Sequence, residues 1–317
     1  MKRKTFYTRG PWSVRALVAA GVLLAACGGS SGAGPDSSAG GGNTPGTGGT
    51  ISGNAIKGPV GNGTVTAFAL TNGAKGAQIA TAPTDGQGHF TMDMGTHSGP
   101  VLLELHGGTF VDEATNGTMA MGSADVMTAV VPAFAAGSSV TIMMTPLTSM
   151  AQTMAQGMSG GMTDANIASA NGGVGGYFDV DDILHTTPMD PLVPGSGTSA
   201  TPAMKNYGMS IAAMSQYAHT VGMTVSSSGM VTAMMDDASD GVMNGKMGST
   251  PIDMAGMGGM GGGMMGGGTM MSTTSGTSGL GSAMSEFVGS SMNRSGVPMS
   301  EMQPLIAKLT SSSGALK

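Results

Sequence analysis

Methionine and glycine make up almost the whole of one stretch of the chain, residues 254–271. Thioether sulfur is a soft ligand that prefers Cu(I) and Ag(I), and a glycine-rich segment can wrap several sulfurs around one ion. The sequence therefore offers a soft-metal site here as a hypothesis. Three alternatives stay open: low-complexity sequence, a sticky interaction segment, and methionines that are sacrificed to oxidation. The candidate ligands are Met254, Met257, Met260, Met264, Met265, Met270 and Met271.

Many of the other methionines have a simpler explanation. The chain has 33 methionines, and methionine replaces leucine in a protein core at modest cost. Phe90, Met92 and Met94 alternate with polar residues, so we expect them on the buried face of a strand. His89 then points away from the two methionines. This disfavours the alternative, a metal site in which His89 and His97 join the thioethers.

A second candidate metal site follows one of the expected helices. Asp236, Asp240 and Asn244 fall at positions 1, 5 and 9 of a Ca²⁺ loop, and their oxygen atoms are suitable ligands for that ion. Ala238 and Met247 stand where two further ligands belong. The competing interpretation, an acidic turn after a helix, is therefore favoured.

Nothing in the sequence assembles a catalytic site. The pattern Gly-x-Ser-x-Gly occurs at 157–161, but no apolar strand leads into it and no His/Asp arrangement supports it. The five histidines show no metal-binding spacing such as His-Glu-x-x-His. Asp112 and Glu113 lie at an expected hairpin turn and are interpreted as structural. We therefore expect a protein that is not an enzyme.

The N-terminal residues 1–26 have the pattern of an export signal. Five cations without an acid precede an apolar run that ends at Ala26, and this run is too short to span a bilayer. Cys27, the only cysteine, follows directly. The junction resembles the lipobox of bacterial lipoproteins, which implies acylation of the Cys27 thiol and cleavage before it. The alternative is an ordinary secreted protein with an unpaired thiol.

The charge and the expected anchor limit the partners of the chain. Removing the five N-terminal cations from the 12 basic residues leaves 7 against 18 acidic residues, a net charge of −11. Such a chain lacks the basic surface of a nucleic-acid-binding protein. Gly28 after the acylated cysteine implies, by the same resemblance, the outer membrane or the cell surface. We expect as partners the membrane, through the lipid on Cys27, and a protein or glycan ligand.

Composition separates the tether and the strand region that follow the signal. Residues 27–50 are almost entirely Gly, Ser, Thr, Pro and Ala, and predict a disordered tether. Residues 51–144 contain short β-like runs separated by glycine-containing turns, a spacing typical of an antiparallel β-sandwich. The expected strands are 64–70, 78–84, 89–94, 100–106, 126–132 and 139–144.

The strand region also resembles a known family of domains. The resemblance is carried by the stretches ISGNAIKGPVGNGTVTAFAL, ATAPTDGQGHFTMDM and GPVLLELHGGTFVDEATNG, and most specifically by Thr84, Asp85, Gly88 and Phe90. These are similar to the transthyretin-like, carboxypeptidase-regulatory-like domain near the N-terminus of many bacterial surface lipoproteins. The resemblance implies an Ig-like β-sandwich module without catalytic activity.

Residues 145–317 are expected to be mainly helical. Thr145 is suited to the N-cap of a helix and Pro146 to its first position. Further helices are expected at 179–185, 201–222, 228–238, 278–292 and 299–312. The glycine content of 254–271 predicts a disordered insertion between two of them. The predicted fold class is α+β and multidomain, with an N-terminal antiparallel β-sandwich followed by a mainly α-helical domain.

These features predict a lipid-anchored cell-envelope or surface protein with a noncatalytic binding or structural role. The alternative is a periplasmic or surface protein that binds Cu(I) or Ag(I) through residues 254–271. No cofactor is expected beyond these metals and Ca²⁺.

Overall fold

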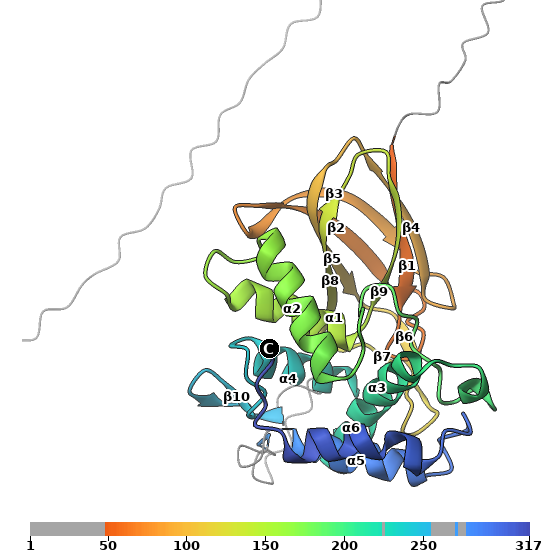
Figure 1. Cartoon of the computed structure of the whole chain (residues 1–317). Helices are drawn as coiled ribbons and strands as arrows, with labels where there is room; N and C mark the ends of the chain where they lie inside the picture. Colours follow the sequence, from red (N-terminus) through yellow and green to blue (C-terminus); the bar gives the residue numbers. More distant parts are fainter. Residues whose placement is uncertain (1–47, 224–225, 255–269, 272–276) are drawn as a thin grey trace, which may run out of the picture. The chain divides into compact units, whose positions relative to one another are not determined.

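The computed structural model describes residues 48–223, 226–254, 270–271 and 277–317, and these have a mixed α+β fold (Figure 1). The larger sheet has four antiparallel strands in the order β3-β2-β5-β8. Its strands are β2 (Thr64–Thr71), β3 (Ala74–Pro83), β5 (Gly99–His106) and β8 (Val126–Phe134). Leu102 and Leu103, neighbours in β5, belong to two different apolar clusters. The sheet is therefore buried on both faces at β5, which explains the continuous apolar run of this strand.

A second sheet has three strands in the order β4-β1-β9. They are β1 (Gly49–Ala55), β4 (His89–Gly95) and β9 (Ser139–Met144). The alternation predicted for β4 is confirmed, with Phe90, Met92 and Met94 buried and His89 exposed. One pair departs from the antiparallel expectation: β1 and β9 are parallel. Parallel strands need a long connection, and here the connection is the rest of the strand region.

The two sheets share one apolar cluster. Methionine takes the place of leucine at several of its positions, as predicted for Met92 and Met94. Members from the smaller sheet include Ile51, Phe90 and Ile142, and members from the larger sheet include Val65, Leu103 and Met127. Two short hairpins complete the described strands: β6 (Thr109–Val111) with β7 (Thr118–Ala120), and β10 (Lys246–Met247) with β11 (Thr250–Pro251).

Six α-helices occur among the described residues after β9. The predicted start of the first is confirmed, because the Thr145 hydroxyl accepts the N–H of Thr148 while the Thr148 hydroxyl accepts the N–H of Thr145. The helices are α1 (Pro146–Gly157), α2 (Asp164–Tyr177), α3 (Pro202–Thr220), α4 (Ser228–Ala238), α5 (Ser278–Gly289) and α6 (Met299–Ser311), with a 3-10 turn, η1, at Ser196–Thr198.

Two helical expectations differ from the structure. The segment 179–185 forms turns rather than a helix, because Asp182 Oδ1 accepts the backbone N–H groups of Leu184 and His185. The helix α2 was not expected, since glycine disfavours helices. Close packing requires glycine there: a Cβ on Gly175 would lie 2.4 Å from the carbonyl oxygen of Val180.

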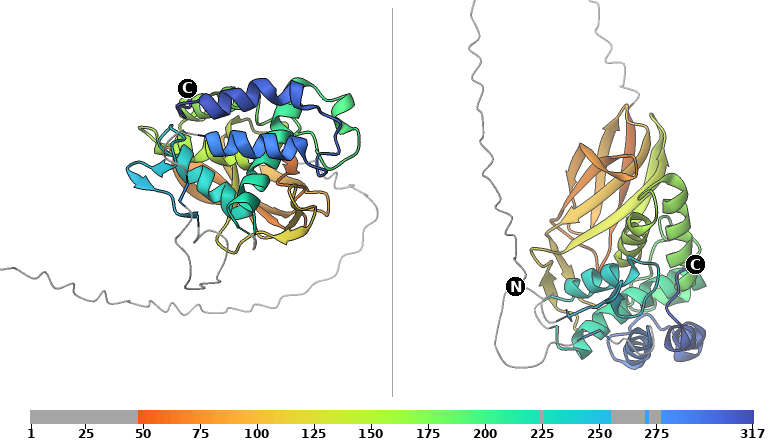
Figure 2. Two further views of the ribbon diagram at one scale, coloured as in Figure 1. Left: turned by 90° about the horizontal axis from the view of Figure 1, so that it is seen from below. Right: turned by 90° about the vertical axis from the view of Figure 1, so that its left-hand side faces the viewer.

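The helices pack on the larger sheet and on one another (Figures 1 and 2). Helices α1 and α2 contact β8, α1 also contacts α4, and α3, α5 and α6 pack in succession. Their apolar side chains form the second cluster, to which Leu102 and Val130 of the larger sheet contribute. All described residues belong to one compact unit. None of the described helices has the length and apolar character needed to cross a membrane.

Candidate functional site

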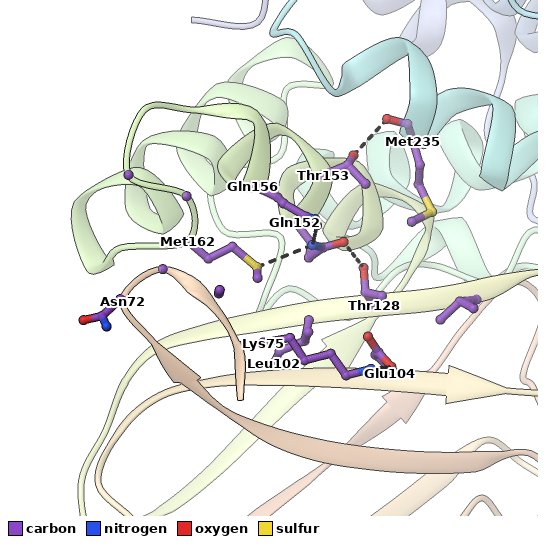
Figure 3. A pocket seen from close by; sticks show the side chains of 15 residues that line it. Asn72, Lys75, Leu102, Glu104, Thr128, Gln152, Thr153, Gln156, Met162 and Met235 are labelled. Carbon is purple, nitrogen blue, oxygen red and sulfur yellow. Dashed lines mark hydrogen bonds and ion pairs between the residues drawn. The ribbon is translucent and has the colours of Figure 1, made fainter. Parts of the chain in front are cut away.

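A pocket of about 650 Å³ opens between the larger sheet and helix α1 (Figure 3). The β2–β3 turn forms one rim, the segment after α1 forms another, and strands β5 and β8 form the floor. The lining residues are Asn72, Gly73, Ala74, Lys75, Leu102, Glu104, Val126, Thr128, Gln152, Thr153, Gln156, Gly160, Gly161, Met162 and Met235.

The rim of this pocket is fixed by a contact between two glycine-containing turns. Asn72 and Gly73 both have positive φ, +51° and +73°, as a two-residue hairpin turn requires. The carbonyl of Gly73 accepts the N–H of Met162 at 2.8 Å. A Cβ on Gly73 would lie only 1.9 Å from the carbonyl oxygen of Gly160, so this close approach requires glycine.

The polar groups of the pocket are amides, hydroxyls and one ion pair. The Thr128 hydroxyl donates to Gln152 Oε1 at 3.2 Å, and Gln152 Nε2 donates to Gln156 Oε1 at 2.7 Å. Lys75 Nζ lies 2.6 Å from Glu104 Oε2, so the two charges neutralise each other. Neither Ser, Cys nor His is among the described lining residues. The arrangement is suited to binding an uncharged polar molecule.

A second polar site is buried and holds charged groups far apart in the sequence. Lys57, in the turn after β1, has no exposed surface, and Asp112 and Glu113, in the β6–β7 turn, are 1% and 3% exposed. Lys57 Nζ donates to Glu113 Oε2 at 3.1 Å, to Ser227 Oγ at 3.2 Å, and to Ser215 Oγ. Ser215 lies in α3 and Ser227 precedes α4, so the cluster joins the strand region to the helices.

The electrostatics of this cluster keep Asp112 ionised. Burial alone would raise the pKa of Asp112, but the positive charge of Lys57 and the hydrogen bond from Ser227 outweigh burial and lower it. Asp112 Oδ2 accepts the Ser227 hydroxyl at 2.5 Å, and Oδ1 accepts the backbone N–H and the hydroxyl of Thr115. The interpretation of Asp112 and Glu113 as turn residues did not include Lys57. One feature of the sequence could have indicated this site: Lys57 is a single cation within the apolar stretch AIKGPV, residues 55–60.

The calcium hypothesis receives no support from the geometry. Asp236 belongs to α4, Asp240 is exposed, and Oδ1 of Asp240 already accepts the N–H of Val242. The carboxylate that organises this loop is Asp237, whose Oδ1 accepts three backbone N–H groups, starting with that of Asn244 at 2.8 Å. No group of three or more His, Cys, Asp and Glu side chains among the described residues is placed to hold a metal.

The structure separates the candidate methionines into different environments. Met254 and Met271 are buried members of the helical cluster, so these two candidate metal ligands are core residues. Met270 is 52% exposed. Met257, Met260, Met264 and Met265 lie outside the described residues, as do Cys27, residues 1–26 and the tether up to residue 47.

The chain matches no protein-family model, and no curated protein matches it.

Proposed function

We propose that this protein is a lipid-anchored component of the cell envelope that binds a ligand without catalysing its conversion. The proposed anchor is supported by the cationic leader, the short apolar run and the single cysteine, Cys27. We also propose that the four-stranded sheet (β3-β2-β5-β8) and the three-stranded sheet (β4-β1-β9) form a transthyretin-like β-sandwich. Support for the sandwich comes from the apolar cluster to which both sheets contribute, for example through Ile51 and Val65.

The observation that carries the binding role is the pocket of about 650 Å³ beside α1. This volume lies in the range of small-molecule sites, about 300–1,000 Å³. Gln156, at the exposed end of a hydrogen-bonded chain with Gln152 and Thr128, supplies a neutral hydrogen-bonding group, and apolar surface is available from the partly exposed Val126 and Met235. Sugars present hydroxyls and C–H faces together. We therefore propose a neutral glycan as the ligand.

The glycan proposal is tested by calorimetric titration of the mature protein with a panel of neutral oligosaccharides. The variant Ala74→Trp places a large side chain in the pocket and is expected to abolish binding. The matched control is Ala77→Trp, since Ala77 is also exposed on β3 but does not line the pocket. Equal affinity in the wild type and in Ala74→Trp would contradict the assignment, as would the failure of every oligosaccharide to bind.

The anchor is tested separately. In bacteria that express the full chain, Cys27→Ser is expected to remove labelling by radioactive palmitate and to move the protein out of the membrane fraction. Labelling that persists in this variant would show that Cys27 is not the lipidation site.

A further inference from the structure

The buried cluster around Lys57 contains an amine and a carboxyl group in contact, the amine without exposed surface and the carboxyl group nearly so. Lys57 Nζ lies 3.1 Å from Glu113 Oε2 and 3.9 Å from Asp112 Oδ2, and 5.1 Å from the centre of the Phe110 ring. Burying one cation with two carboxylates has a large desolvation cost. The attraction between the charges offsets this cost only where their geometry is close to ideal. A reaction that removes a pair of these charges would relieve this cost.

The groups around Glu113 match the needs of amide formation. Glu113 Oε1 accepts the backbone N–H of Gly58 at 2.6 Å, which is suited to stabilise negative charge that develops on this oxygen. Glu113 Oε2, the oxygen closer to the amine, accepts the Ser215 hydroxyl at 2.5 Å. The two oxygens of Glu113 are thus suited to different roles. Oε1 can hold the developing negative charge, and Oε2 can leave after it is protonated.

A path for the proton leads from the amine to the second carboxylate. Lys57 Nζ donates to Ser227 Oγ at 3.2 Å, and Ser227 Oγ donates to Asp112 Oδ2 at 2.5 Å. Asp112 can therefore accept a proton from the amine through the Ser227 hydroxyl, as a general base. The Ser215 hydroxyl, which is hydrogen-bonded to Asp112 and to Glu113 Oε2, connects Asp112 to the departing oxygen, so that Asp112 can return the proton as a general acid.

We propose that Lys57 and Glu113 form an intramolecular isopeptide bond. Nζ of the Lys57 ammonium gives up two protons and attacks Cδ of Glu113, a C–N bond forms, and the bond between Cδ and Oε2 breaks. Oε2 leaves with the two protons as one water molecule, and the opposite charges of ammonium and carboxylate cancel in a neutral amide. The step is a dehydration, so it needs no oxidant, reductant or cofactor.

The surroundings provide room for the water that is released. A cavity of about 70 Å³ lies against Glu113 and Gly58 and is also lined by Asp190 and Pro191. This volume is sufficient for a water molecule. The bond would connect the turn after β1 to the turn after β6, and so would restrict the unfolded chain across most of the strand region.

The proposal is tested by tandem mass spectrometry of a digest of the denatured full-length protein. We expect a branched peptide that joins Lys57 to Glu113, lighter by one water molecule than its two linear peptides together. Linear peptides at both positions in the wild type would overturn the proposal. A branch at Asp112 would overturn the assignment of Glu113 as acceptor and of Asp112 as base. The wild-type result decides the matter even where a variant fails to fold.

Three variants test the assigned roles. Lys57→Met is expected to abolish the branched peptide, and Asp112→Asn, which keeps the shape of the base but not its charge, is expected to leave the peptides linear. The matched control is Lys75→Met. Lys75 also contacts a glutamate, Glu104, but its side chain is 43% exposed, so the branched peptide should persist. A full yield of branched peptide in Asp112→Asn would refute the proton path through Ser227.

Discussion

Replacing Asp237 by asparagine is expected to stabilise the protein at neutral pH. Asp237 lies near the end of α4 and is 2% exposed. Its Oδ1 accepts the backbone N–H groups of Asn244, Gly245 and Lys246 at 2.8, 2.6 and 3.2 Å. An asparagine side chain can present the same acceptor oxygen to these groups without a charge.

The magnitude follows from the pKa of this carboxyl. Burial raises the pKa of Asp237 from 3.8 to about 6, the charge of Asp240 acts in the same direction, and the three N–H groups oppose them. The folded state therefore binds more protons than the unfolded state between these two values. The resulting stabilisation is present at acid pH and is lost as the pH rises through about 6. At 1.36 kcal/mol for each pKa unit, the ionised carboxylate costs the folded state about 3 kcal/mol at neutral pH.

Urea unfolding followed by circular dichroism measures this effect. Asp237→Asn should raise the free energy of unfolding by about 1–3 kcal/mol near pH 7.5 and leave it nearly unchanged near pH 4. The control Asp181→Asn, at an exposed position, should stay within about 0.5 kcal/mol of the wild type. If Asp237→Asn instead destabilises the protein near pH 7.5, the three N–H groups outweigh burial and the reasoning is wrong.

Two further predictions concern the pocket rim and the methionines. Gly73→Ala should lower the free energy of unfolding by more than about 1 kcal/mol, because the added Cβ would collide with Gly160. The control Gly172→Ala, in open space on α2, should raise the free energy of unfolding by up to about 1 kcal/mol. Equal effects of the two substitutions in urea unfolding would contradict the rim geometry. Met254→Leu and Met271→Leu should each change stability by less than about 1.5 kcal/mol and leave an anaerobic Cu(I) titration unchanged, since both side chains are buried in the core. A loss of Cu(I) stoichiometry in either variant would restore these residues as metal ligands.

Features that depend on neighbouring residues were predictable from the sequence. The Thr145–Pro146 start of α1 and the alternating burial of β4 rely on local hydrogen bonds and on side-chain period, and both are confirmed. All six expected strand positions are occupied by strands. The α+β class follows from these elements, because runs of strands followed by runs of helices are characteristic of it.

Features that depend on distant residues were not predictable. Lys57 meets Glu113, Ser215 and Ser227 across separations of 56, 158 and 170 residues, and no local pattern links them. Helix α2 is similar, since packing of Gly175 against the Val180 carbonyl overrides a composition that disfavours a helix. The pocket also depends on tertiary structure, because a hairpin turn, two strands and a helix contribute to its lining.

The scarcity of charge in this chain bears on the meaning of the buried cluster. Only 9% of the residues are charged, yet Lys57, Asp112 and Glu113 lie together in the interior. Apolar residues of similar volume often fill such a space with equal or greater stability. A contribution to stability therefore does not explain why charged residues occupy this place. An amide between Lys57 and Glu113 would remove two of the three charges. Asp112 would remain with the hydroxyls of Ser227 and Thr115 as its donors. The cluster would then satisfy the rule that buried polar groups are hydrogen-bonded and buried charges are few.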